Sequence, residues 1–303
     1  MPKLLNKVLF SLFTLILFSN CSASKAEFNY SKLKNNHKAI TIWALADIQP
    51  RNKNDKNAFK NAVLDINENF KKVDIAIVAG DIVDRTEPEI FDWYVNTKNM
   101  SNNVDNFYEI IGNHDLKSDR GILFKEKIRE QIHYSVEYGN LLLVFLSDEE
   151  RGKPTVIRDE TFNWWKDVVI SNQDKIIIVV SHAPLEGSGI PFSTLEDRKI
   201  KDSYRFIEIL KKYNVDLWFS GHLHIPHALG DTVVAKKIYN NMDFIHISSI
   251  RPEFAGLKHS ESRILKFLCN TNKVLIRSRD HDLKEWQIEL DEQIELSKKI
   301  SCH

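Results

Sequence analysis

The sequence predicts an α/β fold, and three observations support this class. Short apolar runs rich in β-branched residues recur along the chain, and the run over 75–79 stops abruptly at Gly80 and Asp81. Residues 55–70 carry apolar side chains at helical spacing. The chain has 303 residues, of which 43% are hydrophobic and 28% charged, an ordinary globular composition with ample material for a core. This length suits one large α/β domain or two smaller ones.

The first three predicted elements form a strand–helix–strand unit. A strand is expected over 39–46, a helix over 55–70 and a second strand over 75–79. Such a unit is expected to be parallel and right-handed. Because the second strand is apolar at successive positions, we expect it to be buried on both faces.

The remaining elements continue this alternation. Further helices are expected from Pro88 through Tyr94, from Asp159 through Val169 and from Tyr204 to Tyr213. Further strands are expected over 107–111, 132–136, 141–146, 175–180, 215–219, 243–248, 263–268 and 273–278. Gly139 and Asn140 lie between two of these strands and indicate a hairpin.

Two segments lack a clear pattern. Residues 185–201 show no periodicity and are expected to form a surface loop, which could serve as a substrate lid. Residues 285–299 are both acidic and basic, and we expect a solvated helix or a frayed end there.

The N-terminus has the pattern of an export signal. Lys3 and Lys7 precede the apolar run 8–18, which is too short for a comfortable transmembrane span. Small residues then surround Cys21, and this stretch resembles a bacterial lipoprotein signal in which that cysteine becomes the lipidated first residue. Asn20 departs from the usual Gly or Ala, so cleavage to a soluble secreted protein stays open.

These patterns give an expected division of the chain. A lipoprotein-type signal peptide covers 1–21, a polar tether 22–36, the catalytic domain 37–285 and a C-terminal tail 286–303. The protein would be exported from a bacterial cytoplasm and anchored through lipidated Cys21 to a cell-envelope membrane, or otherwise be periplasmic or secreted. We see no second membrane segment in the sequence.

The charge balance argues against nucleic-acid binding, and the cysteine content argues against a cysteine-based site. Lys plus Arg and Asp plus Glu both number 42, so no global field recruits nucleic acid. Cys21, Cys269 and Cys302 fit neither a zinc spacing nor a disulfide framework, and nothing in the sequence requires the last two to pair.

Metal-capable side chains follow five of the predicted strands. They are Asp47, Asp81, Asn113, His182 and the pair His222 and His224. Ligands in open α/β sheets lie at strand ends, where the crevice is, and Gly80 allows the sharp turn that aims Asp81 into it. A buried carboxylate there needs a cation or a hydrogen-bond network. Carboxylate, amide oxygen and imidazole together suit borderline-hard divalent ions.

The order of these motifs resembles the calcineurin-like metallophosphoesterase family. The motifs are Asp-x-x, Gly-Asp-x-x-Asp, Gly-Asn-His-Asp, His-Ala-Pro and Gly-His-x-His, and they extend over about 40–249. The resemblance implies a four-layer αββα sandwich, which agrees with the element order above.

The resemblance also implies a role for each residue. Asp81 would bridge two metal ions, with Asp47 and His224 completing one site. Asn113, His182 and His222 would complete the other. A bridging hydroxide would attack phosphorus in line, because two cations about 3.5–4 Å apart lower the pKa of water and neutralise the phosphate.

Four further residues would act around the metal ions. His114 would protonate or stabilise the leaving oxygen, and Asp84 would accept a hydrogen bond from its ring and fix its tautomer. Arg85 stands where some relatives have a phosphate-binding arginine, although a surface salt bridge explains it equally well. His227 follows Gly-His-Leu-His closely and could contact substrate at the rim.

The first motif departs from the common Asp-x-His. It reads Asp47-Ile48-Gln49, and a glutamine would ligate the first metal through its amide oxygen. This harder ligand favours Mn²⁺, with Fe, Zn²⁺ or Mg²⁺ still open. An Asp-Ile-Gln motif also resembles manganese-dependent ADP-ribose/CDP-alcohol pyrophosphatases of the family.

The expected function is therefore metal-dependent hydrolysis of a small phosphoester or pyrophosphate. A phosphodiesterase or a nucleotide-type pyrophosphatase is favoured. A phosphomonoesterase of the same family remains open, as does an inactive surface lipoprotein that keeps the fold as a binding module. The sequence leaves the oligomeric state open.

Overall fold

The computed structural model describes residues 38–152, 155–252 and 259–302, which belong to one compact unit, His37–His303. The predicted signal peptide over 1–21, with Cys21, and the tether over 22–36 lie outside the described residues. In the part that is described, no helix has the length and apolar character needed to cross a bilayer.

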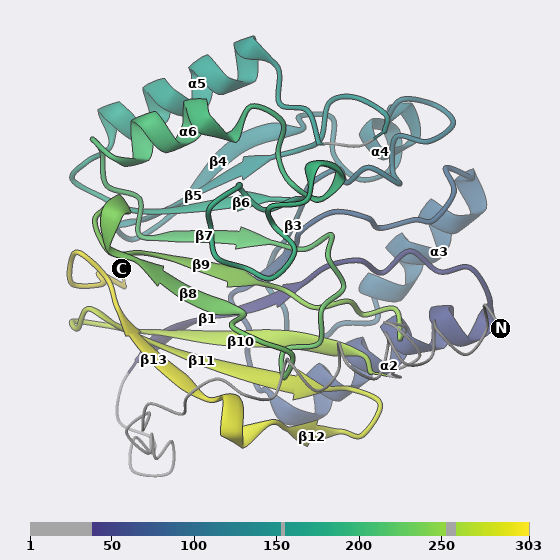
Figure 1. Ribbon diagram of the computed structural model, residues 1–303. Helices are drawn as coiled ribbons and strands as arrows, with labels where there is room; N and C mark the ends of the chain where they lie inside the picture. Colours follow the sequence, from purple (N-terminus) through teal and green to yellow (C-terminus); the bar gives the residue numbers. More distant parts are fainter. Residues whose placement is uncertain (1–37, 153–154, 253–258, 303) are drawn as a thin grey trace, which may run out of the picture. The chain divides into compact units, whose positions relative to one another are not determined.

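The first of two sheets contains the expected strand–helix–strand unit (Figure 1). β1 (Ala39–Leu45) pairs in parallel with β2 (Ile75–Val78), which pairs in parallel with β3 (Phe107–Glu109). On its other side β1 pairs antiparallel with β10 (Glu261–Leu268), and β10 pairs antiparallel with β11 (Lys273–Asp280). All four residues of β2 are buried, as the apolar run predicts.

The second sheet has the order β4-β5-β6-β7-β9-β8. Its strands are β4 (His133–Tyr138), β5 (Leu141–Leu146), β6 (Ile176–Ser181), β7 (Leu217–Ser220), β9 (Met242–His246) and β8 (Val233–Lys236). The predicted hairpin is confirmed, because β4 and β5 pair antiparallel. From β5 to β9 the pairing is parallel, so these strands end at one edge of the sheet. The edge strand β8 was not anticipated from the sequence.

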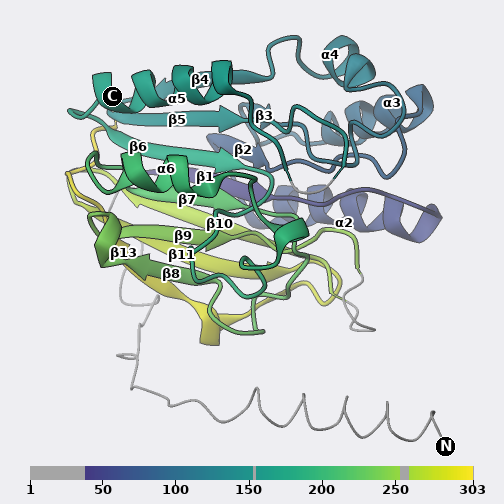
Figure 2. The same cartoon turned by 45° about the horizontal axis from the view of Figure 1, so that its top comes forward.

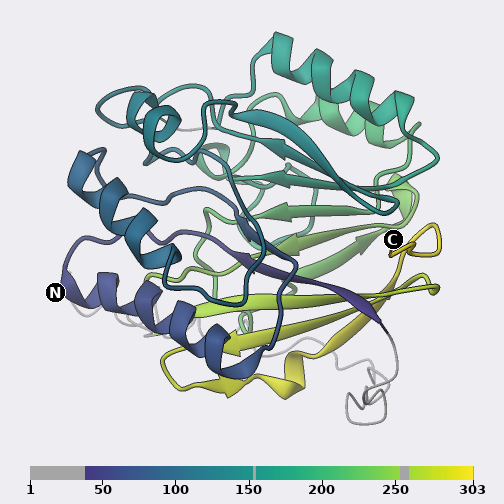
Figure 3. The ribbon, with the colours of Figure 1, turned by 180° about the vertical axis from the view of Figure 1, so that it is seen from behind.

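Helices cover the outer face of each sheet. α2 (Lys53–Asn69), α3 (Pro88–Lys98) and α4 (Ile122–Lys127) pack on the first sheet, and Figure 3 shows α2 and α3 side by side. α5 (Asp159–Ser171) and α6 (Ser203–Leu210) pack on the second, as Figure 2 shows. A third apolar cluster fills the space between the sheets. The fold is therefore the predicted four-layer αββα sandwich.

Local signals explain where the helices begin. The Asn52 side chain caps α2 by accepting hydrogen bonds from the backbone N–H groups of Asn54 and Asp55, at 2.8 and 3.1 Å. Pro88 occupies the first turn of α3, where its missing N–H costs nothing. The short helix α4 follows Gly121, whose φ of 82° requires glycine, and the sequence analysis missed it.

The C-terminal segment differs from the predicted solvated tail. β12 (Glu285–Trp286) and β13 (Glu292–Glu295) both pair antiparallel with β11. Beyond β13, the side chains of Leu296 and Ile300 are buried in the core between the sheets. These apolar residues are too sparse among charged neighbours to show a periodicity, so only the tertiary fold reveals that they anchor the segment.

Cys269 and Cys302 form a disulfide bond. This corrects the inference that the cysteines fit no disulfide framework. The two residues are 33 positions apart in the sequence, and the docking of the C-terminal segment along β11 brings them together.

Candidate metal centre

The predicted ligands meet at the ends of strands from both sheets. Asp47, Asp81 and Asn113 follow β1, β2 and β3 of the first sheet. His182 follows β6, and His222 and His224 follow β7 of the second sheet. Two contacts join the halves directly, since His182 Nδ1 lies 2.8 Å from Ala79 O and His222 N donates to Asp47 Oδ2 at 2.9 Å.

The turns at these strand ends hold strained backbone. Asp47, Asp81, His222 and His224 all have φ between 52° and 68°, which non-glycine residues rarely adopt. Gly80 has φ +84°, and a Cβ there would lie 2.6 Å from His182 Nδ1. The glycine therefore allows the two sheets to approach at this point. Strained residues of this kind cluster at functional sites, where the surrounding structure over-determines them.

A first group of donor atoms comprises Asp81, His182 and His222, whose ligand atoms all lie within 4.8 Å of one another. His182 Nε2 lies 3.4 Å from Asp81 Oδ1 and 3.2 Å from His222 Nδ1. The amide oxygen of Asn113 is also 3.2 Å from His182 Nε2. Carboxylate, amide oxygen and two imidazoles therefore converge on one point.

Hydrogen bonds on the far side of the rings set the tautomers. His182 Nδ1 donates to the backbone carbonyl of Ala79, and His222 Nε2 lies 3.4 Å from the carbonyl of Asp197. Each imidazole thus places its proton away from the group and turns a lone pair toward it. Asp197 belongs to the loop over 185–201, so that loop contacts the site through its backbone. Lone pairs that face one another call for a cation between them.

The electrostatics of this group point the same way. Burial acts to lower the pKa of His182, but neighbouring carboxylates, Asp81 first, raise it well above its ordinary value. Burial and the charge of His182 lower the pKa of His222 to about 3. The site therefore favours one concentrated positive charge rather than two protonated rings, and a metal ion supplies such a charge.

A second group comprises Asp47, Asp81 and His224, again with ligand atoms within 4.8 Å of one another. Asp47 is fully buried, and its Oδ1, 3.2 Å from His224 Nε2, accepts no hydrogen bond from the described residues. An orphaned buried carboxylate oxygen fits a metal ligand. Asp81 belongs to both groups, so its carboxylate could contribute a ligand to an ion in either one.

Gln49 adopts a different orientation from the one predicted. Its Nε2 donates to Asp81 Oδ2 at 2.7 Å and lies 3.1 Å from His224 Nε2. Its Oε1 accepts from Arg251 Nη1 at 2.5 Å. Because arginine only donates hydrogen bonds, this contact fixes the amide with its oxygen away from the site. In this arrangement Gln49 donates to Asp81, and its amide oxygen faces Arg251 instead of the donor groups.

His114 lies beside the two groups with the predicted partner. Its Nδ1 is 3.1 Å from Asp84 Oδ1, and its backbone N–H donates to Asp81 Oδ1 at 2.8 Å. The sequence analysis missed Lys117, whose Nζ is 2.5 Å from His114 Nδ1 and 3.8 Å from Asp84 Oδ1. Nδ1 therefore faces both a donor, Lys117, and two acceptors, the carboxylate and the backbone carbonyl of Asp84.

Two predicted substrate contacts, Arg85 and His227, make no hydrogen bond or ion pair with the donor groups in the described residues. Arg85 is exposed to solvent. His227 is buried rather than at a rim, because its Nε2 accepts a hydrogen bond from Ser248 N at 3.0 Å and its backbone N–H donates to Glu261. The arginine that does lie among the site residues is Arg251, which has no motif context in the sequence.

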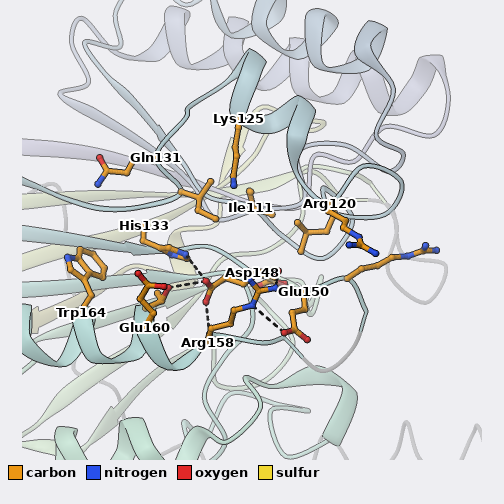
Figure 4. A pocket seen from close by; sticks show the side chains of 15 residues that line it. Ile111, Arg120, Lys125, Gln131, His133, Asp148, Glu150, Arg158, Glu160 and Trp164 are labelled. Carbon is orange, nitrogen blue, oxygen red and sulfur yellow. Dashed lines mark hydrogen bonds and ion pairs between the residues drawn. The ribbon is translucent and has the colours of Figure 1, made fainter.

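A separate cavity of about 840 Å³ opens beside the site (Figure 4). It lies between the ends of β3 and β5 and the helices α4 and α5, and no predicted metal ligand lines it. Its walls carry both charge signs, with Arg158 paired to Glu150 at 3.3 Å and His133 to Glu149 at 3.2 Å. Burial raises the pKa of Asp148 in its wall to about 7. The cavity is thus distinct from the metal centre.

Comparison with known proteins identifies the family. A family model described as calcineurin-like phosphoesterase matches residues 40–226, a range that contains every predicted metal ligand. The chain belongs to this family. Its members are metal-dependent hydrolases that generally hold two divalent ions and act on small phosphoester substrates.

Individual relatives are distant. A protein of Xenorhabdus bovienii named a probable cyclic nucleotide phosphodiesterase is 23% identical over 165 residues, which are 53% of this chain and 65% of that protein. The chain thus spans less than two thirds of this relative.

Two solved structures share the fold with 15% sequence identity. The purple acid phosphatase PPD1 of yellow lupin has a TM-score of 0.62, over 86% of this chain and 54% of that one. GAP50 of Plasmodium, described as the anchor in the inner membrane complex, has a TM-score of 0.56, over 86% and 90% of the two chains.

Proposed function

We propose that this protein hydrolyses phosphoester bonds with two divalent metal ions and acts as a phosphodiesterase or a nucleotide-type pyrophosphatase. One observation supports this most strongly. Asp81 belongs to two groups of donor atoms, and within each group the atoms lie within 4.8 Å of one another. This arrangement is costly without cations and is suited to a pair of them.

The described residues divide between the two ions as follows. Asp47 and His224 would hold one ion, and Asn113, His182 and His222 the other, with Asp81 shared. When bound, such ions supply a hydroxide nucleophile at neutral pH and neutralise the phosphate. Gln49 keeps the Asp81 carboxylate in position by donating to its Oδ2.

His114 would deliver a proton to the leaving oxygen. Its ring is 22% exposed, so it reaches the solvent side of the site. Asp84 Oδ1 against Nδ1 would stabilise the protonated ring, whose Nε2 proton is the one given to the leaving oxygen, and Lys117 lies against both residues.

The substrate class rests on two resemblances. The relative named a probable cyclic nucleotide phosphodiesterase favours a diester. The Asp-Ile-Gln motif favours a pyrophosphate and Mn²⁺. Because Gln49 turns its amide nitrogen to the site, the preference for Mn²⁺ over Fe, Zn²⁺ or Mg²⁺ rests on that motif alone.

We also propose export and membrane anchoring through lipidated Cys21, after a signal peptide over 1–21. The disulfide between Cys269 and Cys302 supports this, because such bonds persist in oxidising compartments outside the cytoplasm.

The function is tested by assaying protein without residues 1–21. An aryl phosphodiester, a phosphomonoester and a nucleotide pyrophosphate are each tried with Mn²⁺, Mg²⁺, Zn²⁺ and Co²⁺, beside a chelated sample. We expect turnover of the diester or the pyrophosphate with Mn²⁺ and none after chelation. Preference for the monoester would overturn the substrate class. Absence of turnover throughout, with two bound ions, would indicate a binding module instead.

A further inference from the structure

Arg251 is fixed beside Asp47 by its backbone. Its N–H donates to Asp47 O at 3.1 Å, and Ser249 Oγ lies within hydrogen-bond distance of Asp47 O, at 3.1 Å, and of Arg251 O, at 2.7 Å. The Arg251 side chain therefore begins next to Asp47 at the metal centre, although the two residues are far apart in the sequence.

Its guanidinium lies among three residues of the site. Nη1 donates to Gln49 Oε1 at 2.5 Å and is 3.8 Å from Asp84 Oδ1, while Nη2 is 3.3 Å from His224 Nδ1. Only 12% of the side chain is exposed. Nε is buried and has no hydrogen-bond partner among the described residues.

Among the described residues, no carboxylate lies at hydrogen-bond distance from this guanidinium. A buried arginine is normally matched by a carboxylate at hydrogen-bond distance. Here the acceptor is a neutral amide, and the carboxylate of Asp84 lies beyond that distance. Arg51 is a further positive charge nearby, and the negative charges around the guanidinium are those of Asp47, Asp84 and Asp55. An anion that accepts from the unpartnered N–H of the guanidinium would complete the site.

Metal binding by His224 would break its contact with Arg251 and free the Nη2 donor of Arg251. An imidazole that binds a metal through Nε2 carries its proton on Nδ1, so Nδ1 accepts nothing from Arg251. Nη2 then joins Nε as a donor without a partner. These two N–H groups lie on one edge of the guanidinium, which matches two oxygens of a phosphoryl group.

We propose that Arg251 binds the substrate phosphate through its Nε and Nη2, with Gln49 holding the guanidinium in place. Arg251 thereby takes the role that the sequence suggested for Arg85. The inference rests on the proposed phosphoesterase function and adds a specific anion contact to it.

The test compares Arg251→Gln with the matched control Arg85→Gln. Affinity for inorganic phosphate is measured by calorimetry on metal-loaded protein, with the metal content of each variant. Loss of a bidentate charge-assisted contact should weaken phosphate binding about 10- to 100-fold. KM should rise by a similar factor. Arg251→Lys should restore part of the affinity, because an ammonium keeps the charge but loses the fork. Arg85→Gln should match the wild type.

Two results would overturn the inference. One is wild-type phosphate affinity in Arg251→Gln with both ions retained. The other is loss of metal from that variant, which would make Arg251 a support of the ligands. Failure of the proposed function is distinguishable, because the wild-type protein would then show no turnover, whether or not it binds two ions.

Discussion

His114 shows how single contacts define a role. Its backbone N–H is bonded to Asp81, and its ring meets Asp84 and Lys117. Because the ring itself contacts no predicted metal ligand in the described structure, His114→Ala should keep both ions. Rates should fall about 10²- to 10⁴-fold for substrates with poor leaving groups and much less for good ones, as for a general acid. A series of aryl esters of graded leaving-group pKa measures this. Equal losses along the series would contradict a proton-donor role.

Gln49 offers a second test at this scale. Because its amide nitrogen faces the site, removing the side chain should not remove a ligand. Gln49→Leu should therefore retain two ions per chain by elemental analysis, while phosphate binding weakens as Arg251 loses its acceptor. If one ion is lost, the amide oxygen is a ligand after all.

The sequence predicted which residues gather but not how they are oriented. The motif residues follow apolar runs, and parallel strands bring such positions to one edge. The orientation of Gln49 depends on Arg251, which is 202 positions away. Arg251 and Lys117 stand in no motif, so no local pattern marks them. His227 looked like a rim residue by its spacing, yet Ser248 and Glu261 bury it.

At the scale of elements, β9 carries the buried carboxyl group of Asp243, whose raised pKa lowers the stability of the fold at high pH. Burial, with Glu292 of β13 and Asp216 before β7, raises the pKa of Asp243 to about 7. The unfolded chain releases this proton near pH 4, so stability falls as the pH rises from about 4 to 7.

Asp243→Asn should remove this penalty. We expect the free energy of unfolding to rise by roughly 1–2 kcal/mol at pH 8, a figure reduced from the full linkage value for solvent screening. At pH 4 the change should be small. Urea unfolding at the two pH values measures it, and an effect of equal size at both would contradict the raised pKa.

The missed elements have a common physical cause. α4, β8 and β13 are short, and their burial is supplied by neighbours rather than by their own periodicity. Strands such as β5 and β6 could be predicted because they are nearly continuous apolar runs. In the structure every residue in them is buried.

At the scale of the whole molecule, the site exists only where the two sheets meet. The first sheet supplies Asp47, Asp81 and Asn113, and the second supplies His182, His222 and His224. The apolar cluster between the sheets fixes their spacing. The family resemblance implied this architecture and the element order agreed with it, whereas the disulfide of the C-terminal segment became evident only in the fold.

Metal content of wild-type protein and Asp81→Asn tests the central claim most directly. Equilibrium dialysis against Mn²⁺ followed by elemental analysis counts the bound ions. We expect two ions per chain in the wild type and reduced occupancy at both positions in the variant, because Asp81 belongs to both donor groups. A wild type that binds a single ion, or a variant that loses one ion and keeps the other fully, would contradict a shared two-ion centre.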